Sequence, residues 1–292
     1  MPKFGVERGG SAPAEFGATV LADGVAFAVH SRHAERIEVC LFDAAGETEL
    51  ARLPLLSRDG DTHHGRITGI GIGTRYGLRA HGPFRPELGH RFDLAKLLID
   101  PYARRLDRPF AWHPDLALPP DRAVDTAALV PKAIVEVGQK QPAPFARVAP
   151  RLIYELPVRA FSMRHPDIQN EQRGTLAALT HPKLLDHLKR IGVDTVELMP
   201  LQAWIDERHL PPLGLSNAWG YNPLTLFALD PRLAPGGLAD LRNAVAALHA
   251  AGMQVVLDIV LNHSGESDEA GATLSFREIG RASCRERVCL AV

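Results

Sequence analysis

The sequence predicts an N-terminal all-β, immunoglobulin-like sandwich followed by the first part, about three of eight βα units, of a TIM (β/α)8 barrel. Two observations support this fold class. From residue 11 to about 84, short runs alternate apolar with small or charged residues, and Asp23-Gly24, Ala45-Gly46 and Asp59-Gly60 separate them. This is typical of half-buried strands joined by tight turns. From Arg151 onward, aliphatic runs alternate with amphipathic helical segments, which is typical of parallel βα units.

Composition excludes several classes of function. The 292 residues are 46% hydrophobic and 23% charged with a net charge of -1, so no basic surface for nucleic acid is indicated. No apolar run approaches the ~20 residues that cross a bilayer, and the first residues lack a signal-peptide core. We therefore expect no nucleic-acid or membrane partner and a cytoplasmic location.

The three cysteines match neither a disulfide framework nor a metal-ligand spacing, so we expect no cofactor and no metal. Cys40 lies in an apolar strand pattern and is expected to be a buried small hydrophobic residue. His63 and His64 have no third ligand nearby and are interpreted as loop histidines.

The sandwich strands follow from alternation. Apolar residues recur at every second position in two runs, and residues 74–83 predict a late strand followed by a turn. From Gly89 to about Pro150, repeated prolines forbid long helices, so this stretch is interpreted as an ordered linker that lies against its neighbours. The two alternating runs are Val25, Phe27, Val29 and Ile37, Val39, Leu41.

The second half contains three predicted strands, at residues 152–156, 193–200 and 253–263, and two predicted helices, at 182–191 and 238–251. The near-continuous aliphatic run of the third strand predicts burial on both faces of a parallel sheet. Only 142 residues follow Pro150, fewer than the about 250 of a complete barrel. The sequence therefore predicts the front of a barrel.

Polar residues at the carboxyl end of a barrel strand point into the active-site mouth. The third strand ends in Asp258-Ile-Val-Leu-Asn262-His263, and the long loop after the second strand carries Trp219-Gly-Tyr221. Two aromatic rings around a glycine form a flat surface with polar edges, which suits the C–H face of a sugar. The alternative for Trp219 is a ring packed on its own loop.

These segments, with Ile153-Tyr-Glu-Leu156, resemble the opening conserved segments of the α-amylase superfamily of glycoside hydrolases. Flanking segments resemble the bacterial glycogen debranching enzymes, the isoamylase-type α-1,6-glucosidases. The flanking segments are residues 73–83, 91–102, 181–190, 206–210 and 272–277.

The resemblance implies hydrolysis of α-1,6 branch linkages in glycogen or another branched α-glucan. It implies that Tyr221 stacks under the sugar next to the scissile bond, with Trp219 also in the substrate site, and that His263 hydrogen-bonds that sugar. Asp258 and Asn262 would shape the strand end. The alternatives are a non-catalytic α-glucan-binding fragment, or branching, trehalose release or α-1,4 hydrolysis.

The same resemblance places the two catalytic carboxylates on the fourth and fifth strands, so none of the residues in this sequence is expected to be catalytic and the chain is expected to be inactive. Glu266, Asp268 and Glu269 are acidic loop residues without a barrel position. Pro157 stands where the family usually has His, which removes a polar side chain near the site.

We divide the chain into three parts. Residues 1–145 would form the sandwich, similar to glycogen-binding modules, with its linker. Residues 146–277 would form the incomplete barrel. Residues 278–292 look like a translated adapter oligonucleotide and are interpreted as a non-native tail.

Overall fold

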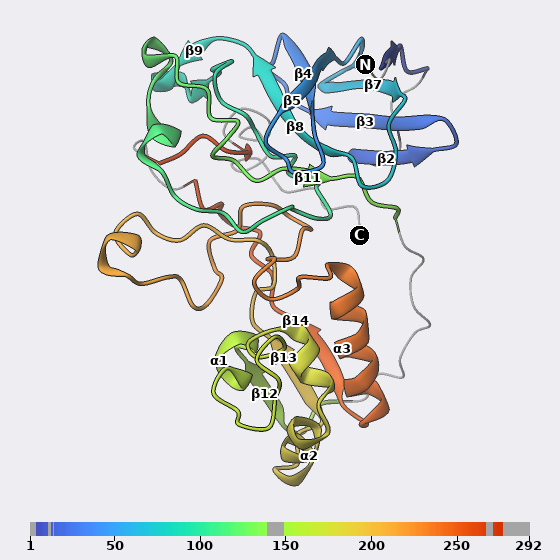
Figure 1. Cartoon of the computed structure of the whole chain (residues 1–292), viewed down its shortest axis with the longest axis vertical. Coiled ribbons are helices and arrows are strands. Elements are labelled where there is room, and N and C mark those ends of the chain that lie inside the picture. The colour runs from blue at the N-terminus through green and yellow to red at the C-terminus, as the bar shows by residue number, and fades with distance from the viewer. Residues whose placement is uncertain (1–3, 11–12, 14, 139–148, 267–270, 277–292) are drawn as a thin grey trace.

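Two antiparallel sheets form the N-terminal half of the chain (Figure 1). The computed structural model describes residues 4–10, 13, 15–138, 149–266 and 271–276, so Asp268, Glu269 and the proposed tail 278–292 lie outside the described residues. The first sheet has the order β1 (Gly5–Glu7), β7 (Thr62–Thr68), β3 (Gly24–His30), β2 (Gly17–Leu21), with β6 (Ser57–Asp59) also paired to β7. The second has the order β11 (Ala133–Ile134), β8 (Arg75–His81), β4 (Arg36–Phe42), β5 (Glu49–Pro54).

Alternating side chains of the two sheets fill the space between them. Phe27 of β3 and Tyr76 of β8 are both buried and meet edge to face, with ring centroids 5.1 Å apart. The predicted sandwich is confirmed, including the turns after β2, β4 and β6.

Connector residues 89–135 cover the outer face of the second sheet. Leu97, Leu98, Phe110 and Leu116 are buried in the same hydrophobic core as the sandwich strands. Strand β9 (Phe84–Arg85) and the 3-10 helix η1 (Pro86–Leu88) precede the connector, and β9 pairs with β10 (His90–Arg91) at its start. The connector itself contains only short elements, among them the 3-10 helices η2 (Pro114–Ala117) and η3 (Pro120–Arg122). Because its second face is covered, β8 is buried at five successive positions and not at alternate ones.

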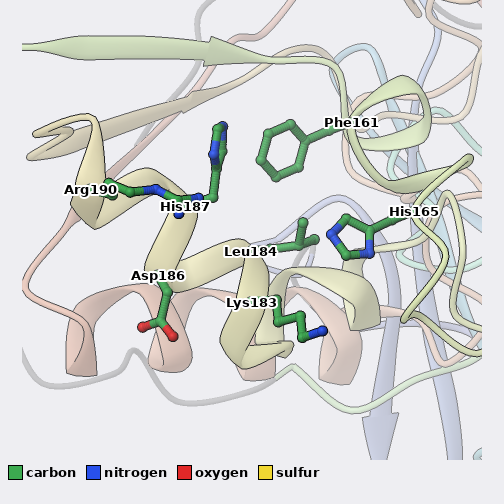
Figure 2. A pocket seen from close by; sticks show the side chains of 7 residues that line it. All are labelled: Phe161, His165, Lys183, Leu184, Asp186, His187 and Arg190. Carbon is green, nitrogen blue, oxygen red and sulfur yellow. The ribbon is translucent and has the colours of Figure 1, made fainter.

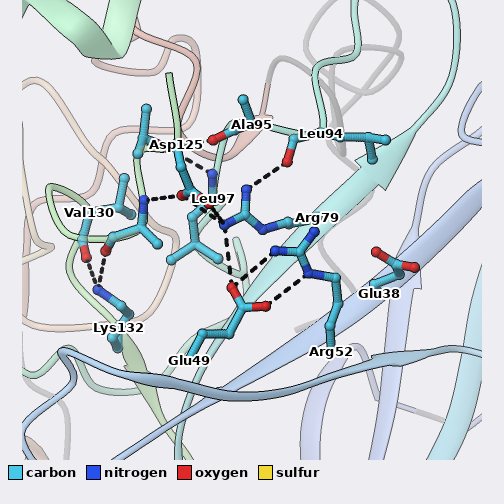
Figure 3. Close-up of polar contacts among 12 residues, drawn as sticks. Glu38, Glu49, Arg52, Arg79, Leu94, Ala95, Leu97, Asp125, Val130 and Lys132 are labelled. Atoms are coloured by element: carbon cyan, nitrogen blue, oxygen red, sulfur yellow. Dashed lines mark hydrogen bonds and ion pairs between the residues drawn. The ribbon is translucent and has the colours of Figure 1, made fainter. Parts of the chain in front are cut away.

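The covered face holds two buried cations (Figure 3). The guanidinium of Arg79 donates to the Leu94 carbonyl at 2.6 Å and to the Asp125 carboxylate at 2.8 Å. The ammonium of Lys132 donates to the carbonyls of Ala127 and Val130, both at 2.6 Å. Arg79 therefore ties a connector carbonyl to the sandwich, whereas Lys132 ties two carbonyls within the connector, and these hydrogen bonds compensate for the removal of each charge from water.

One prediction in this half is wrong. His63 and His64 are not loop residues but lie in β7, and both are buried. Burial lowers the pKa of His63 because the charged imidazolium is poorly solvated there. The alternation that would have revealed the strand is hidden, since two adjacent polar residues interrupt it. Cys40, in contrast, is a buried free cysteine as expected.

Three parallel strands form the second half: β12 (Ile153–Leu156), β13 (Thr195–Leu198) and β14 (Gln254–Leu257), paired in that order. The helices between them are α1 (Val158–Ser162), α2 (Pro182–Arg190) and α3 (Leu238–Ala250), with 3-10 helices η4 (Leu176–Thr180) and η5 (Pro211–Leu213). Strand, helix, strand, helix, strand with parallel pairing is the predicted front of a barrel.

Helices α2 and α3 lie where helical periodicity places them. Proline occupies the first turn of α2, where its missing N–H costs no hydrogen bond, and Gly192 adopts a φ of +84° just after the helix. Leu184 and Leu188 of α2 and Leu241 and Leu248 of α3 are buried. The short elements α1 and η4 were not predicted.

The expected burial of the third strand on both faces is wrong. Val256, Leu257 and Ile259 are 44–54% exposed. Within the described residues β14 is an edge strand, as is β12, and only the central β13 is largely buried. An aliphatic run predicts burial only where neighbouring strands cover it.

The loops that follow β13 and β14 extend the sandwich core into the barrel half (Figure 1). Ala203, Ile205 and Leu224 belong to the same buried cluster as the sandwich. The backbone of Ile99 donates to the carbonyl of Leu274 at 2.7 Å, and the Ser275 hydroxyl donates to the carbonyl of Ile99 at 2.9 Å. No helix in the described part of the chain is long and apolar enough to span a membrane.

Candidate functional site

Tyr221 and Asp258 meet at the carboxyl end of the parallel sheet. Asp258 directly follows β14, and its backbone N–H donates to the Leu198 carbonyl of β13 at 2.9 Å, so the strand pairing fixes it. The Tyr221 hydroxyl donates a hydrogen bond to the Asp258 carboxylate. That bond, together with burial, raises the pKa of Tyr221 to about 12, because the phenolate would face a carboxylate. The phenol therefore stays neutral and its ring is held in place.

His263 contacts the backbone of Tyr221. Its Nε2 is 2.6 Å from the Tyr221 carbonyl, and its Nδ1 is 3.1 Å from Oδ1 of Asn262. The side chains of Asn262 and His263 are exposed. The structure thus brings together Tyr221, Asp258, Asn262 and His263, four of the five residues that the sequence singled out.

Trp219, the fifth residue, stands apart. Its side chain is 68% exposed, so it is not packed on its own loop. The loop is set by Asn217, whose side-chain oxygen accepts from the backbone N–H groups of Trp219 and Gly220, both at 2.9 Å. Gly220 has a φ of +81°, and a side chain there would approach the Pro200 carbonyl to 2.9 Å, so the position requires glycine.

Sequence reasoning missed the polar residues that hold this loop. Glu207 accepts through Oε1 from the side-chain amides of Asn217 at 3.0 Å and Asn222 at 2.8 Å. Arg232 pairs with Asp206 at 3.2 Å and with the buried Asp230 at 2.9 Å. Asp206 and Glu207 lie in the segment 206–210 that resembles the debranching enzymes, but nothing in that segment indicated that they hold a loop, since a density of Asp, Glu and Asn is also typical of solvated loops.

Two further carboxylates line the sheet near Tyr221. Glu155 of β12 and Glu197 of β13 are direct partners in the strand register. Both contribute to the raised pKa of Tyr221, so their charges lie within electrostatic reach of its hydroxyl. The surroundings of the Tyr221 hydroxyl are therefore acidic, which favours a neutral or cationic ligand group over an anionic one next to Tyr221.

Glu266, one of the three loop acids, has a structural position. It is buried, and its Oε1 accepts from the backbone N–H groups of Leu274 at 2.7 Å and Ser275 at 2.8 Å. It therefore connects the loop after β14 to the segment that pairs with Ile99 of the connector.

Pro157 follows β12 directly, at the same edge of the sheet as Asp258. It precedes the first turn of α1, and its carbonyl accepts from the Phe161 backbone N–H at 3.0 Å. Pro157 thus helps to begin α1 but offers no polar side chain to the site.

Two pockets lie near these elements. One, of about 450 Å³, is on the helix side and is lined by residues of α1, α2 and the loop between them (Figure 2). The other, of about 270 Å³, lies beside the Tyr221 loop and includes Asn222 and Gly265. No cluster of three or more His, Cys, Asp or Glu residues suited to a metal occurs in the described ranges.

Comparisons with known proteins match both halves of the chain. Residues 15–103 match the family model of carbohydrate-binding module 48, the isoamylase N-terminal domain, and residues 159–275 match the catalytic domain of α-amylase. Glycogen debranching enzymes of Yersinia enterocolitica and Klebsiella pneumoniae are 45% and 43% identical over 93% of the chain. The chain spans 42% of the length of each of these relatives.

Solved structures show the same fold at lower identity. The catalytic module of a multi-modular glycogen-degrading pneumococcal virulence factor aligns over 92% of this chain and 43% of its own, with a TM-score of 0.66 and 21% identity. A pullulanase from Bacillus acidopullulyticus aligns over 93% of this chain and 32% of its own, with a TM-score of 0.66 and 19% identity.

Proposed function

Because the chain belongs to the α-amylase superfamily, in the branch of the bacterial glycogen debranching enzymes, we propose that it supplies the sandwich and the first strand ends of an enzyme that hydrolyses α-1,6 branch linkages in glycogen. The observation that best supports this is the group of Tyr221, Asp258 and His263 at the carboxyl end of the sheet. In β/α barrels this end carries the active site. We also propose a cytoplasmic location and the division of the chain at about residue 145.

The group can hold one sugar ring. The Tyr221 ring offers an apolar face, and its hydroxyl is already bonded to Asp258, so the ring keeps its orientation without a ligand. His263 is exposed, and its contacts at Nε2 with the Tyr221 carbonyl and at Nδ1 with Oδ1 of Asn262 hold the imidazole next to Tyr221, so a sugar hydroxyl can bond to Nδ1 by replacing Asn262. Asn262 supports that histidine, and Trp219 extends the aromatic surface outward.

Cleavage needs a further pair of groups. A retaining glycosidase uses two carboxyl groups about 5–5.5 Å apart, one as nucleophile and one as acid and base. Glu155 and Glu197 lie within the sheet and Glu266 is occupied by backbone N–H groups, so none is assigned to cleavage. We therefore propose that the 292-residue chain binds α-glucan without hydrolysing it, and that strands four and five of the whole enzyme supply the carboxyl pair.

A hybrid enzyme tests the proposal. Residues 1–276 of this chain would be joined to the remaining part of the 45% identical debranching enzyme of Yersinia enterocolitica. We expect the hybrid to release reducing ends from glycogen limit dextrin, but not from amylose. The Tyr221→Ala variant should lower kcat by roughly a hundredfold, since it removes a contact to the reacting sugar.

Lys183→Ala, in the pocket on the helix side, is the matched control and should leave the rate unchanged. A folded hybrid that cleaves amylose and spares limit dextrin would replace debranching by α-1,4 hydrolysis. Hydrolysis of limit dextrin by the 292-residue chain alone would contradict the missing carboxyl pair.

A further inference from the structure

A second concave surface lies where the connector meets the barrel loops. This seam pocket has a volume of about 270 Å³. Trp112 of the connector forms one wall, and Asp206, Glu207 and Asn222 of the loop after β13 form another. Gly265 and Ala272, beyond β14, complete it. Its volume is close to the lower end, about 300 Å³, of ordinary small-molecule sites.

The walls combine one aromatic face with hydrogen-bond acceptors. Trp112 is half-buried and packs on the sandwich core, so its ring is fixed while part of it faces the pocket. Glu207 is held by two amide donors through Oε1, and its buried Oε2 has no hydrogen-bond partner among the described residues. A buried acceptor without a donor is costly, so the site favours a ligand or solvent molecule that carries O–H groups.

Charge narrows the class of ligand. The lining carries both signs of charge, since Asp206 and Glu207 lie beside Arg208 and His209, so no excess of positive charge attracts an anion. A cation would find few free oxygens, because Asp206 pairs with Arg232 at 3.2 Å and Glu207 already accepts two bonds. A neutral ring with an apolar face and several hydroxyl groups satisfies both walls.

The pocket is also joined to the candidate sugar site. Asn222 follows Tyr221 directly, and Gly265 lies two residues after His263. The Gly265 backbone donates to the Pro223 carbonyl at 2.8 Å, and a side chain at Gly265 would approach the Asn222 carbonyl to 2.7 Å. The two loops therefore lie in contact between the pocket and the Tyr221 ring.

We propose that the seam pocket is an accessory subsite that binds a glucose unit of an α-glucan chain, with its ring against Trp112 and its hydroxyls toward Glu207 and Asn222. This inference rests on the proposed function, because it assigns the pocket to the same substrate class. The connector of the sandwich would then contribute directly to glucan recognition.

The test titrates the whole 292-residue chain with maltotetraose in a calorimeter. Trp112→Leu keeps an apolar side chain but removes the aromatic face. Glu207→Gln keeps an acceptor for the two amides but replaces the other oxygen with a donor. Each should weaken binding about tenfold, whereas the control Lys183→Ala should bind as the parent does. Near-UV circular dichroism checks that every variant is folded. If Trp112→Leu does not fold, the affinity of Glu207→Gln alone decides whether the pocket binds maltotetraose.

Two results would overturn the inference: no saturable binding of maltotetraose, or unchanged affinity in both seam variants. Its failure is distinguishable from that of the proposed function. If the hybrid enzyme cleaves limit dextrin while the seam variants bind normally, only the subsite is wrong. If the seam variants lose affinity while the hybrid is inactive, only the debranching activity is wrong.

Discussion

Asp100 gives the sharpest prediction about stability. It lies in the connector beneath the sandwich and is only 1% exposed. Oδ2 accepts from the Tyr76 hydroxyl and Oδ1 from the Tyr102 backbone N–H, both at 2.8 Å. Burial raises the pKa of Asp100 from 3.8 to about 6, because the two hydrogen bonds offset only part of the lost hydration.

The sign of the pH dependence follows. Between the unfolded pKa of 3.8 and the folded pKa of about 6, the folded chain binds a proton that the unfolded chain has released. The contribution of Asp100 to stability is therefore complete below pH 3.8 and is lost as pH rises through 6. At 1.36 kcal/mol for each pKa unit, the loss is about 3 kcal/mol.

The Asp100→Asn variant should remove this dependence. An amide cannot ionise, so above pH 6 the variant should be more stable than the parent by up to about 3 kcal/mol, reduced by roughly 1 kcal/mol if one hydrogen bond is lost. Tyr76→Phe should act in the opposite sense, since it removes a donor that favours the carboxylate and so raises the pKa of Asp100 further.

Urea unfolding at intervals from pH 4 to pH 7.5, followed by far-UV circular dichroism, measures both effects. The decisive quantity is the change in the free energy of unfolding across that range. A change of the same size in Asp100→Asn as in the parent would refute the assignment of this pH dependence to Asp100.

Two further predictions concern the junction of sandwich and barrel. Glu266→Ala leaves the backbone N–H groups of Leu274 and Ser275 buried without an acceptor, so urea unfolding should show a loss of about 3 kcal/mol, with a smaller loss in Glu266→Gln; an unchanged midpoint in Glu266→Ala would contradict this. Residues 151–277 produced alone should be insoluble or molten, because apolar residues such as Ile205 lose their cover and β14 exposes its edge; a sharp thermal transition in that fragment would contradict it.

The predictable part of the fold is the part governed by local pattern. Helix α2 has leucines at helical spacing, a proline in its first turn and a glycine after its end, and its observed bounds differ from the predicted ones by one residue. The burial of β14 failed because burial depends on which strands lie next to it, and one chain segment carries no information about its neighbours. The prediction for His63 and His64 failed because two adjacent polar residues interrupt the alternation of a strand, although both side chains are buried in β7.

In the candidate site, too, some residues could be predicted from the sequence and others could not. Asp258 and His263 could be found because they end a predicted strand, and Tyr221 because its Trp-Gly-Tyr segment, together with that strand end, resembles the α-amylase superfamily. Glu207 and Asn222 could not, since their importance comes from a contact across fifteen residues of irregular loop. Hydrogen bonds of this kind depend on the backbone turns of the loop and on the orientation of side-chain amides, neither of which can be predicted from the alternation of polar and apolar residues.

The connector of the sandwich is bonded to the loop that carries His263, so the sandwich supports the candidate site. Ile99 holds residues 274 and 275 by two hydrogen bonds, and Glu266 holds the same two residues from the loop that carries His263. The segment is thus bonded on one side to the connector and on the other to the strand end. The hydrogen bonds of Ile99 and of Glu266 to residues 274 and 275 are both buried. Displacing the connector would therefore also disturb the hydrogen bonds of the Glu266 carboxylate to the backbone of these two residues. The sandwich therefore supports the position of the strand-end loop whether or not its own surface binds glucan.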